Sequence, residues 1–420
     1  MPPASLLAGG AVTLYHPASP QPPRRARFLR VFMQFLIIAL SLAGFIVVAC
    51  MRVTDPLLPV IAADFGVSVG QAGIVVTAYA VAYGVFMLAY GPLGDRYGKL
   101  KIIALTLTAA AFCVAACAYA DSLMSLASLR FLTGIASAAT VPLALAYIGD
   151  QVGMAQRQAT IARYMSGIIV GQMLGSALGG VLSDWFGWRA IFLLFGVATG
   201  LAALLVWTLV RTEVKPLGAP APLRQAGARY ASLLRDPKAA DLITTALIEG
   251  FCVFGGLAFV GAMLHERHAL SFTMVGLSLL CYGIGGLLYS ATAPLLLRYL
   301  GQRGMIAFGG VLMAWSFIML AISSVWWACP LALVVLGFGF YLMHSTLQTL
   351  ATEMVPSARG TSFALFAFAL FAGQAIGVTA VGWLIDREGY TVALGAVGIG
   401  IGLLGLWMQG SPMVPKRKPA

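Results

Sequence analysis

Residues 171–188 read GQMLGSALGGVLSDWFGW, and residues 373–390, which lie 202 positions later, read GQAIGVTAVGWLIDREGY. Seven of the eighteen aligned positions are identical without a gap. The same offset carries Pro92, Leu93, Arg96, Tyr97, Lys101 and Arg157 onto Pro294, Leu295, Arg298, Tyr299, Arg303 and Arg359. The chain is therefore predicted to consist of two related halves.

Both halves are strongly apolar. Of the 420 residues, 60% are hydrophobic and 10% are charged, whereas soluble domains carry about a quarter charged residues. A spanning helix needs about 20 apolar residues. Twelve runs of suitable length lie at 31–58, 70–92, 102–120, 123–148, 161–183, 188–210, 239–263, 273–297, 304–323, 326–350, 360–384 and 390–409.

The predicted fold is an all-α membrane protein with twelve transmembrane helices in two pseudo-symmetric six-helix bundles. An even number of helices in each half gives both halves the same orientation, as in transporters with parallel repeats. We expect a disordered cytoplasmic tail, an N-terminal bundle, a basic cytoplasmic linker, a C-terminal bundle and a second cytoplasmic tail, at 1–30, 31–210, 211–238, 239–409 and 410–420.

The charge distribution predicts the orientation in the membrane. Cationic loops stay cytoplasmic, and most cations fall on one side if both termini are cytoplasmic. The exceptions are Arg130 inside a run and, on the other side, Arg52, Arg189, Arg267 and Arg387. The net charge of +12 therefore indicates topology in an inner, or plasma, membrane. It does not indicate nucleic-acid binding, because the cations are spread over separate loops.

The chain shows no signs of cofactor chemistry. None of its six cysteines falls in a predicted outer loop, and they have no metal-ligand spacing. A nucleotide-binding Gly-Lys-Ser/Thr loop is also missing. We predict neither an enzyme nor an ATP-driven pump, and no metal or cofactor.

Between the second and third runs lies GPLGDRYGKLK, residues 91–101. This loop resembles the signature loop of the major facilitator superfamily at Gly91, Leu93, Gly94, Asp95, Arg96, Gly98 and Lys99. The resemblance extends over residues 31–409 and implies a secondary transporter. An acid here can cap a helix of the other half while the cations pair with a neighbouring acid. The resemblance gives these gating roles to Asp95 and Lys99, with Asp150 as partner; a solvated cytoplasmic turn is the alternative.

Two further segments resemble motifs of the same family. LRFLTGIASAA, residues 129–139, places Arg130 at a depth where a charge is costly, so it should face a cavity or a partner. GSALGG, residues 175–180, aligns with the antiporter motif, but Ser176 replaces its proline, which weakens the inference of efflux. SDWFGWRAIF and ARGTSFALF, at 183–192 and 358–366, look like the drug and metabolite efflux branch.

The fifth run carries a glycine at every fourth position. Such a stripe lets neighbouring helices approach closely. Ordinary helix packing explains the stripe, and sliding or bending during transport is the additional possibility. The residues are Gly167, Gly171, Gly175 and Gly179.

Arg52 and Asp55 could lie at a helix end or inside the membrane. As one helix, residues 31–60 would measure about 45 Å, against a hydrocarbon core of about 30 Å. The family's first helix often carries a Pro-x-x-Pro pattern, which Pro56 and Pro59 match, and this favours the cavity. Arg52 and Asp55 are spaced i, i+3, which puts the two side chains next to each other and favours the ionised carboxylate of Asp55.

Glu249 is the clearer intramembrane acid, because the sequence around it is apolar and shows no nearby cation. We predict that Glu249 and Asp55 are the protonatable groups and that Arg52 and Arg130 oppose them across the cavity. A structural acid is the alternative for Glu249. His344 could reach the cavity or pack as a neutral side chain, and Gln172 and Gln374 are polar candidates related by the repeat.

These features predict a proton-coupled secondary transporter that moves a small organic molecule by alternating access, with efflux favoured. The partners are the substrate, protons and the lipid bilayer, and a twelve-helix chain should function as a monomer. A proton-coupled importer is the alternative within transport. A non-transporting membrane sensor or assembly factor is the alternative outside it.

Overall fold

The computed structural model describes residues 24–210, 230–354, 359–411 and 413–414, and every regular element in these ranges is helical. The predicted tail up to residue 23, the linker from 211 to 229, and residues 412 and 415–420 of the second tail lie outside the described residues. The chain divides into two compact units, Met1–Leu36 and Ile37–Ala420.

The elements follow one another along the chain without any strand in the described ranges. They are α1 (Arg24–Arg52), η1 (Asp55–Leu57), α2 (Leu58–Phe65), α3 (Val69–Ala72), α4 (Ile74–Tyr97), α5 (Lys99–Ala116), η2 (Cys117–Tyr119), α6 (Leu123–Ser137), α7 (Thr140–Gln151), α8 (Met154–Val210), α10 (Pro237–His268), α11 (Phe272–Ile322), α12 (Ala328–Met354) and α13 (Arg359–Trp407). The all-α fold class is confirmed.

Among the described residues, nine helical segments are long and apolar enough to span a membrane. Three of them, α8, α11 and α13, are each two helices joined at a glycine with positive φ. The glycines are Gly187 (φ 74°), Gly301 (φ 64°) and Gly389 (φ 80°), a region that glycine enters without a steric penalty. Divided at these glycines, the nine segments become twelve, in agreement with the number of apolar runs in the sequence.

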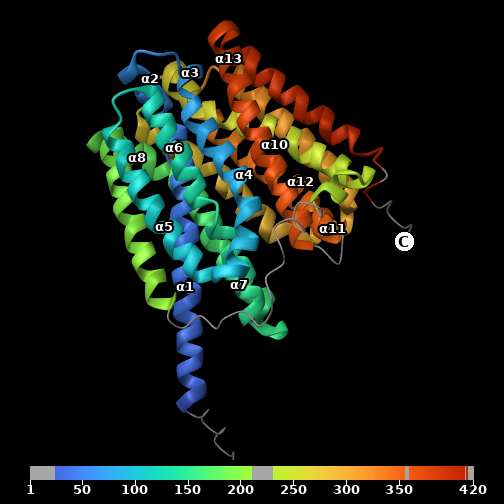
Figure 1. The fold of residues 1–420 in the computed structure, drawn as a ribbon. Helices are drawn as coiled ribbons and strands as arrows, with labels where there is room; N and C mark the ends of the chain where they lie inside the picture. The colour runs from blue at the N-terminus through green and yellow to red at the C-terminus, as the bar shows by residue number, and fades with distance from the viewer. Residues whose placement is uncertain (1–23, 211–229, 355–358, 412, 415–420) are drawn as a thin grey trace, which may run out of the picture. The chain divides into compact units, whose positions relative to one another are not determined.

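Helix packing brings distant segments together (Figure 1). In the first half α5 packs on α8 and α4 on α6, and in the second half α10 packs on α13 and α11 on α12. Contacts between the halves are made by α8 with α11 and by α4 with α13. The division into two six-helix bundles at residues 31–210 and 239–409 stays a prediction.

The first helix ends earlier than the sequence predicts. A single helix through residue 58 is wrong, because α1 ends at Arg52 and a turn leads into η1. Pro56 has no N–H to donate to the carbonyl of Arg52 four residues earlier. That carbonyl instead accepts a hydrogen bond from the Ser176 hydroxyl of α8 at 3.3 Å.

Two turns define the ends of the first half. At the "Gly66 end", Gly66 (φ 63°) terminates α2 and Ser68 caps α3. At the opposite "Gly98 end", Gly98 (φ 97°) separates α4 from α5. The corresponding ends of the whole second unit carry the same two names.

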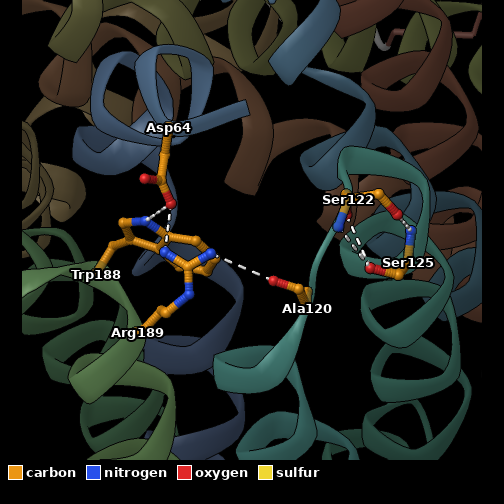
Figure 2. A network of polar contacts seen from close by, with 6 residues as sticks. All are labelled: Asp64, Ala120, Ser122, Ser125, Trp188 and Arg189. Carbon is orange, nitrogen blue, oxygen red and sulfur yellow. Dashed lines mark hydrogen bonds and ion pairs between the residues drawn. The ribbon is translucent and has the colours of Figure 1, made fainter. Parts of the chain in front are cut away.

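A polar network at the Gly66 end ties α2 to α8 (Figure 2). Trp188 donates its indole N–H to Asp64 at 3.1 Å, and Arg189 pairs with the same carboxylate and also reaches the carbonyl of Ala120. Beside it, Ser122 and Ser125 form the capping box of α6. The offset of 202 carries Asp64 and Trp188 onto Glu266 and Tyr390, and Tyr390 donates to Glu266 at 3.0 Å. Both halves are therefore fastened internally in the same way.

Candidate functional site

Arg52 is the last residue of α1 and Asp55 is the first residue of η1, and both are buried, with exposed fractions of 4% and 2%. The guanidinium and carboxylate are 3.6 Å apart, which is an ion pair longer than a hydrogen bond. Arg52 also lies over the ring of Phe254 of α10, 4.4 Å from its centroid. The pair is therefore inside the protein, against the second half, and not at an exposed helix end; its place in a membrane cavity stays a prediction.

Glu249 of α10 is fully buried. Its Oε2 lies 3.0 Å from Nδ1 of His344 on α12, and its Oε1 has no hydrogen-bond partner. The sequence predicted no basic group beside Glu249, and the structure corrects this: the partner is a residue 95 positions away. The His344 ring stacks on Phe340 at 4.7 Å.

Aromatic rings connect these two ionisable pairs. Phe254 contacts Phe340 edge to face at 5.3 Å, and Tyr282 contacts both Phe340 at 5.9 Å and Tyr341 at 6.4 Å. A continuous chain of side-chain contacts therefore joins Arg52 to Glu249, and it passes through Phe254, Phe340 and His344. Sequence reasoning missed Phe340, although its i, i+4 spacing from His344 signals a shared helix face.

Arg130 lies on the other side of the α1 end. It is 1% exposed, donates to the carbonyls of Cys50 at 3.0 Å and Met51 at 3.5 Å, and lies over the Tyr79 ring at 4.4 Å. The last carbonyls of a helix have no partner within the helix and are favoured by positive charge. The contacts of Arg130 are thus to carbonyls and rings, whereas Asp55 pairs with Arg52 and Glu249 with His344.

The two glutamines differ in their surroundings. Gln374 of α13 is 1% exposed and its Oε1 has no hydrogen-bond partner. It adjoins α10, because a Cβ at Gly250, next to Glu249, would lie 3.1 Å from its backbone nitrogen. Gln172 of α8 is half-buried. Buried polar groups without a hydrogen-bond partner are rare in proteins. Besides Gln374 Oε1, the hydroxyl of Tyr282, one of the aromatic residues described above, is also buried without a partner.

The predicted gating loop occupies the Gly98 end. Lys99 lies 2.8 Å from both Asp95 and Asp150, so it joins α4, α5 and α7 within the first half. Gly94 lies against Leu143 of α7, whereas a Cβ on Gly91 would meet open space. Gly98 requires positive φ, and Arg96 is exposed, over the ring of Tyr97. The cap by Asp95 on a helix of the second half stays a prediction.

The glycine stripe of α8 faces α1. A Cβ on Gly167, Gly171, Gly175 or Gly179 would lie 3.1, 2.5, 2.7 or 2.5 Å from the backbone of α1 or the turn after it. The atoms met belong to Ser41, Phe45, Ala49 and Val53, which also recur every four residues. Alanine in place of glycine would therefore force the two backbones apart.

Within the described ranges, no group of three or more His, Cys, Asp and Glu side chains could hold a metal ion. His265 interacts with the carbonyl of Leu270 at 2.8 Å and stacks on Phe272. The candidate site is thus built from Arg52–Asp55, Glu249–His344 and the rings between them. Such a site can bind an organic molecule and hold protons.

The family model of the Major Facilitator Superfamily matches residues 40–378. The chain belongs to the Major Facilitator Superfamily. It is 27% identical over 340 residues to the MFS-type transporter YceJ of Bacillus subtilis, covering 79% of this chain and 84% of that one. It is 31% identical over 171 residues to the multidrug export protein EmrB of Escherichia coli, which is 41% of this chain and 33% of EmrB.

Solved structures agree on the fold. The nucleoside transporter NupG superposes with a TM-score of 0.73 at 14% identity, over 89% of this chain and 98% of NupG. Together with the family match, this makes the chain a multi-pass membrane transporter with the major facilitator fold.

Proposed function

We propose that this transporter exports a small organic molecule across the inner membrane in exchange for protons. The observation that carries the proposal is the pair of Glu249 and His344, a carboxylate and an imidazole 3.0 Å apart. Glu249 is completely buried inside a membrane-spanning segment. Intramembrane ionisable residues are rare and are found along substrate, ion and proton pathways.

The pair can exchange protons because of its chemistry. An ionised Glu249 in apolar surroundings needs a positive partner, and a protonated His344 supplies one, so the pair is neutral with one proton. A second proton makes it positive, and loss of the first makes it negative. Each charged form of the pair favours a conformation in which the site is open to water, because a buried net charge is costly. Proton exchange is thereby coupled to alternating access. Asp55, held by Arg52, is the second acid in the proposal.

The energy of the proton gradient is sufficient for export. One charge that crosses 100 mV releases about 2.3 kcal/mol, and each 1.4 kcal/mol corresponds to about tenfold in an equilibrium constant. One coupled proton therefore supports roughly fifty-fold accumulation from the electrical gradient alone.

The surroundings of the pair support an organic substrate. Phe254, Phe340, Tyr282 and Tyr341 supply aromatic faces, and binding sites for small molecules combine such walls with a few polar groups. The Tyr282 hydroxyl and Gln374 Oε1 are buried without hydrogen-bond partners and can orient a polar group of the substrate. The name of EmrB, a multidrug export protein, supports export.

The test is transport by the purified chain in proteoliposomes. A panel of organic compounds is screened for uptake driven by an imposed pH gradient, and proton movement is recorded with a pH-sensitive dye. We expect Glu249→Gln to abolish gradient-driven accumulation, because the amide cannot release a proton, while downhill exchange of the compound persists. Glu353→Gln, which removes an exposed acid of α12, is the matched control and should behave as the unmodified chain. Proton movement with substrate in Glu249→Gln contradicts the assignment.

Import is the second candidate, and Ser176 is the observation that favours it. The serine stands where the antiporter motif has proline, and its hydroxyl binds the carbonyl of Arg52, a bond that proline cannot make. Movement of the compound in the same direction as the protons would identify an importer, whereas movement in the opposite direction would identify an exporter. Binding of a compound without any flux would identify a sensor.

A further inference from the structure

Two aspartates related by the repeat join the two halves at the Gly66 end. Asp184 of α8 accepts hydrogen bonds from the backbone N–H groups of Phe272, at 3.2 Å, and Thr273, at 2.7 Å, both in α11. Asp386 of α13 lies 202 positions later. It accepts from the Ser68 hydroxyl at 2.6 Å and from the Gly70 N–H at 3.1 Å. Each aspartate thus bonds to the other half.

A close approach between backbones adjoins each aspartate. Gly180, four residues before Asp184, lies so near α11 that a Cβ would clash with the Phe272 carbonyl oxygen. Gly382, four residues before Asp386, has the same place beside Gly70, whose carbonyl oxygen would lie 2.9 Å from a Cβ. The repeated segments GVLSD and GWLID therefore bring both backbones into contact.

The N–H groups that Asp184 contacts are the first ones of a helix. The first N–H groups of a helix have no partner within the helix, and the positive end of its dipole attracts a carboxylate. Asp184 supplies that carboxylate to the long helix α11, whereas Asp386 accepts from the Ser68 hydroxyl and the Gly70 N–H beside the four-residue α3. Because donors and acceptor belong to different halves, these bonds form only while this end is closed.

We propose that Asp184 and Asp386 are a pair of latches that hold the transport pathway closed at the Gly66 end. They are positioning residues of alternating access and lie away from Glu249 and His344. The inference rests on the fold and its two halves and does not depend on proton coupling or on the substrate. Loss of one latch shifts the population towards the state open at this end, and loss of both shifts it further.

Distance measurement between spin labels tests the latches. Labels are placed at Ala63→Cys of α2 and Val392→Cys of α13, both exposed positions, in the full chain with the half-buried Cys113 and Cys281 changed to alanine. Asp184→Asn and Asp386→Asn keep the side-chain shape but remove the charge that strengthens the bonds. We expect each to raise the ratio of long to short distances by up to about tenfold, which corresponds to about 1.4 kcal/mol.

Glu388→Gln is the control, because it removes an exposed acid two residues from Asp386. It should leave the distance distribution unchanged. A variant that fails to fold is recognised by loss of the monodisperse peak in gel filtration, and the other latch then decides the question, because both act on the same separation. Unchanged distances in a folded double variant would overturn the proposal. So would an equal shift in Glu388→Gln, since general charge removal would then explain the effect.

Discussion

At the scale of single residues, Arg130 shows how a buried charge can serve the backbone. Its guanidinium donates to Cys50 and Met51 at the end of α1, where Pro56 prevents the helix from continuing through Arg52. Buried carbonyls without donors are costly. A role that fits these contacts is stabilisation of the helix end, and the opposition of Arg130 to the acids stays a prediction.

We therefore expect Arg130→Met to destabilise the folded chain by about 2 to 4 kcal/mol, because two buried carbonyls lose charged donors. Arg130→Lys keeps the charge but places its donors on a single nitrogen in place of the two that bind Cys50 and Met51, so its cost should be about half. Thermal unfolding in detergent measures both. Arg387→Met is the control, since Arg387 is exposed and surface substitutions usually change stability by less than about 0.5 kcal/mol. A folded Arg130→Lys chain that loses proton coupling would support the role predicted from the sequence instead.

Some residues of the candidate site could be recognised from the sequence because they are charged. Glu249, Arg52 and Asp55 are charges among apolar residues, a pattern that needs no structure to detect. The partnership of Glu249 with His344 could not be inferred, because it depends on how α10 and α12 are rotated when they pack. Asp184 and Asp386 were already identical in the repeat, but only their contacts across the halves give them a role.

At the scale of elements, α8 and α1 pack through backbone contacts. Gly171 lies against the carbonyl of Phe45, where a Cβ would be 2.5 Å from the oxygen. The partner is backbone and cannot rotate away as a side chain can. The sequence predicted the smooth face of this helix from glycine spacing, but the facing residues of α1 required the structure.

Gly171→Ala should therefore destabilise the chain. Overpacking costs about 1 to 3 kcal/mol, which exceeds the gain of about 1 kcal/mol from replacing glycine inside a helix. Gly200→Ala in the second helix of α8, after Gly187, is the control, because its Cβ would meet Ala111 at an ordinary 3.7 Å, and it should be neutral or slightly stabilising. Thermal unfolding of the two purified variants compares them. A Gly171→Ala chain as stable as Gly200→Ala would contradict this prediction, because the backbones of α1 and α8 could then move apart at little cost in free energy.

At the scale of the whole molecule, the repeat explains features that no single motif predicts. The offset of 202 relates the Asp64–Trp188 and Glu266–Tyr390 contacts within the halves, and the two latches between them. The apolar runs were sufficient to predict the helices, apart from the end of α1 at Arg52. The way in which the halves meet was not predictable, since it is determined by side-chain contacts between segments far apart in sequence.

The orientation of the whole molecule in the membrane stays a prediction. Cations gather in the turn at the Gly98 end, at Arg96, Lys99 and Lys101, so we propose that this end faces the cytoplasm. A membrane-impermeant maleimide applied to intact spheroplasts should label Ala63→Cys at the Gly66 end and should label Lys101→Cys only after permeabilisation; both positions are exposed. The unmodified chain corrects for its own cysteines, which are buried or half-buried. Labelling of Lys101→Cys in sealed spheroplasts, with Ala63→Cys protected, would reverse the topology. The latches would then close the cytoplasmic side.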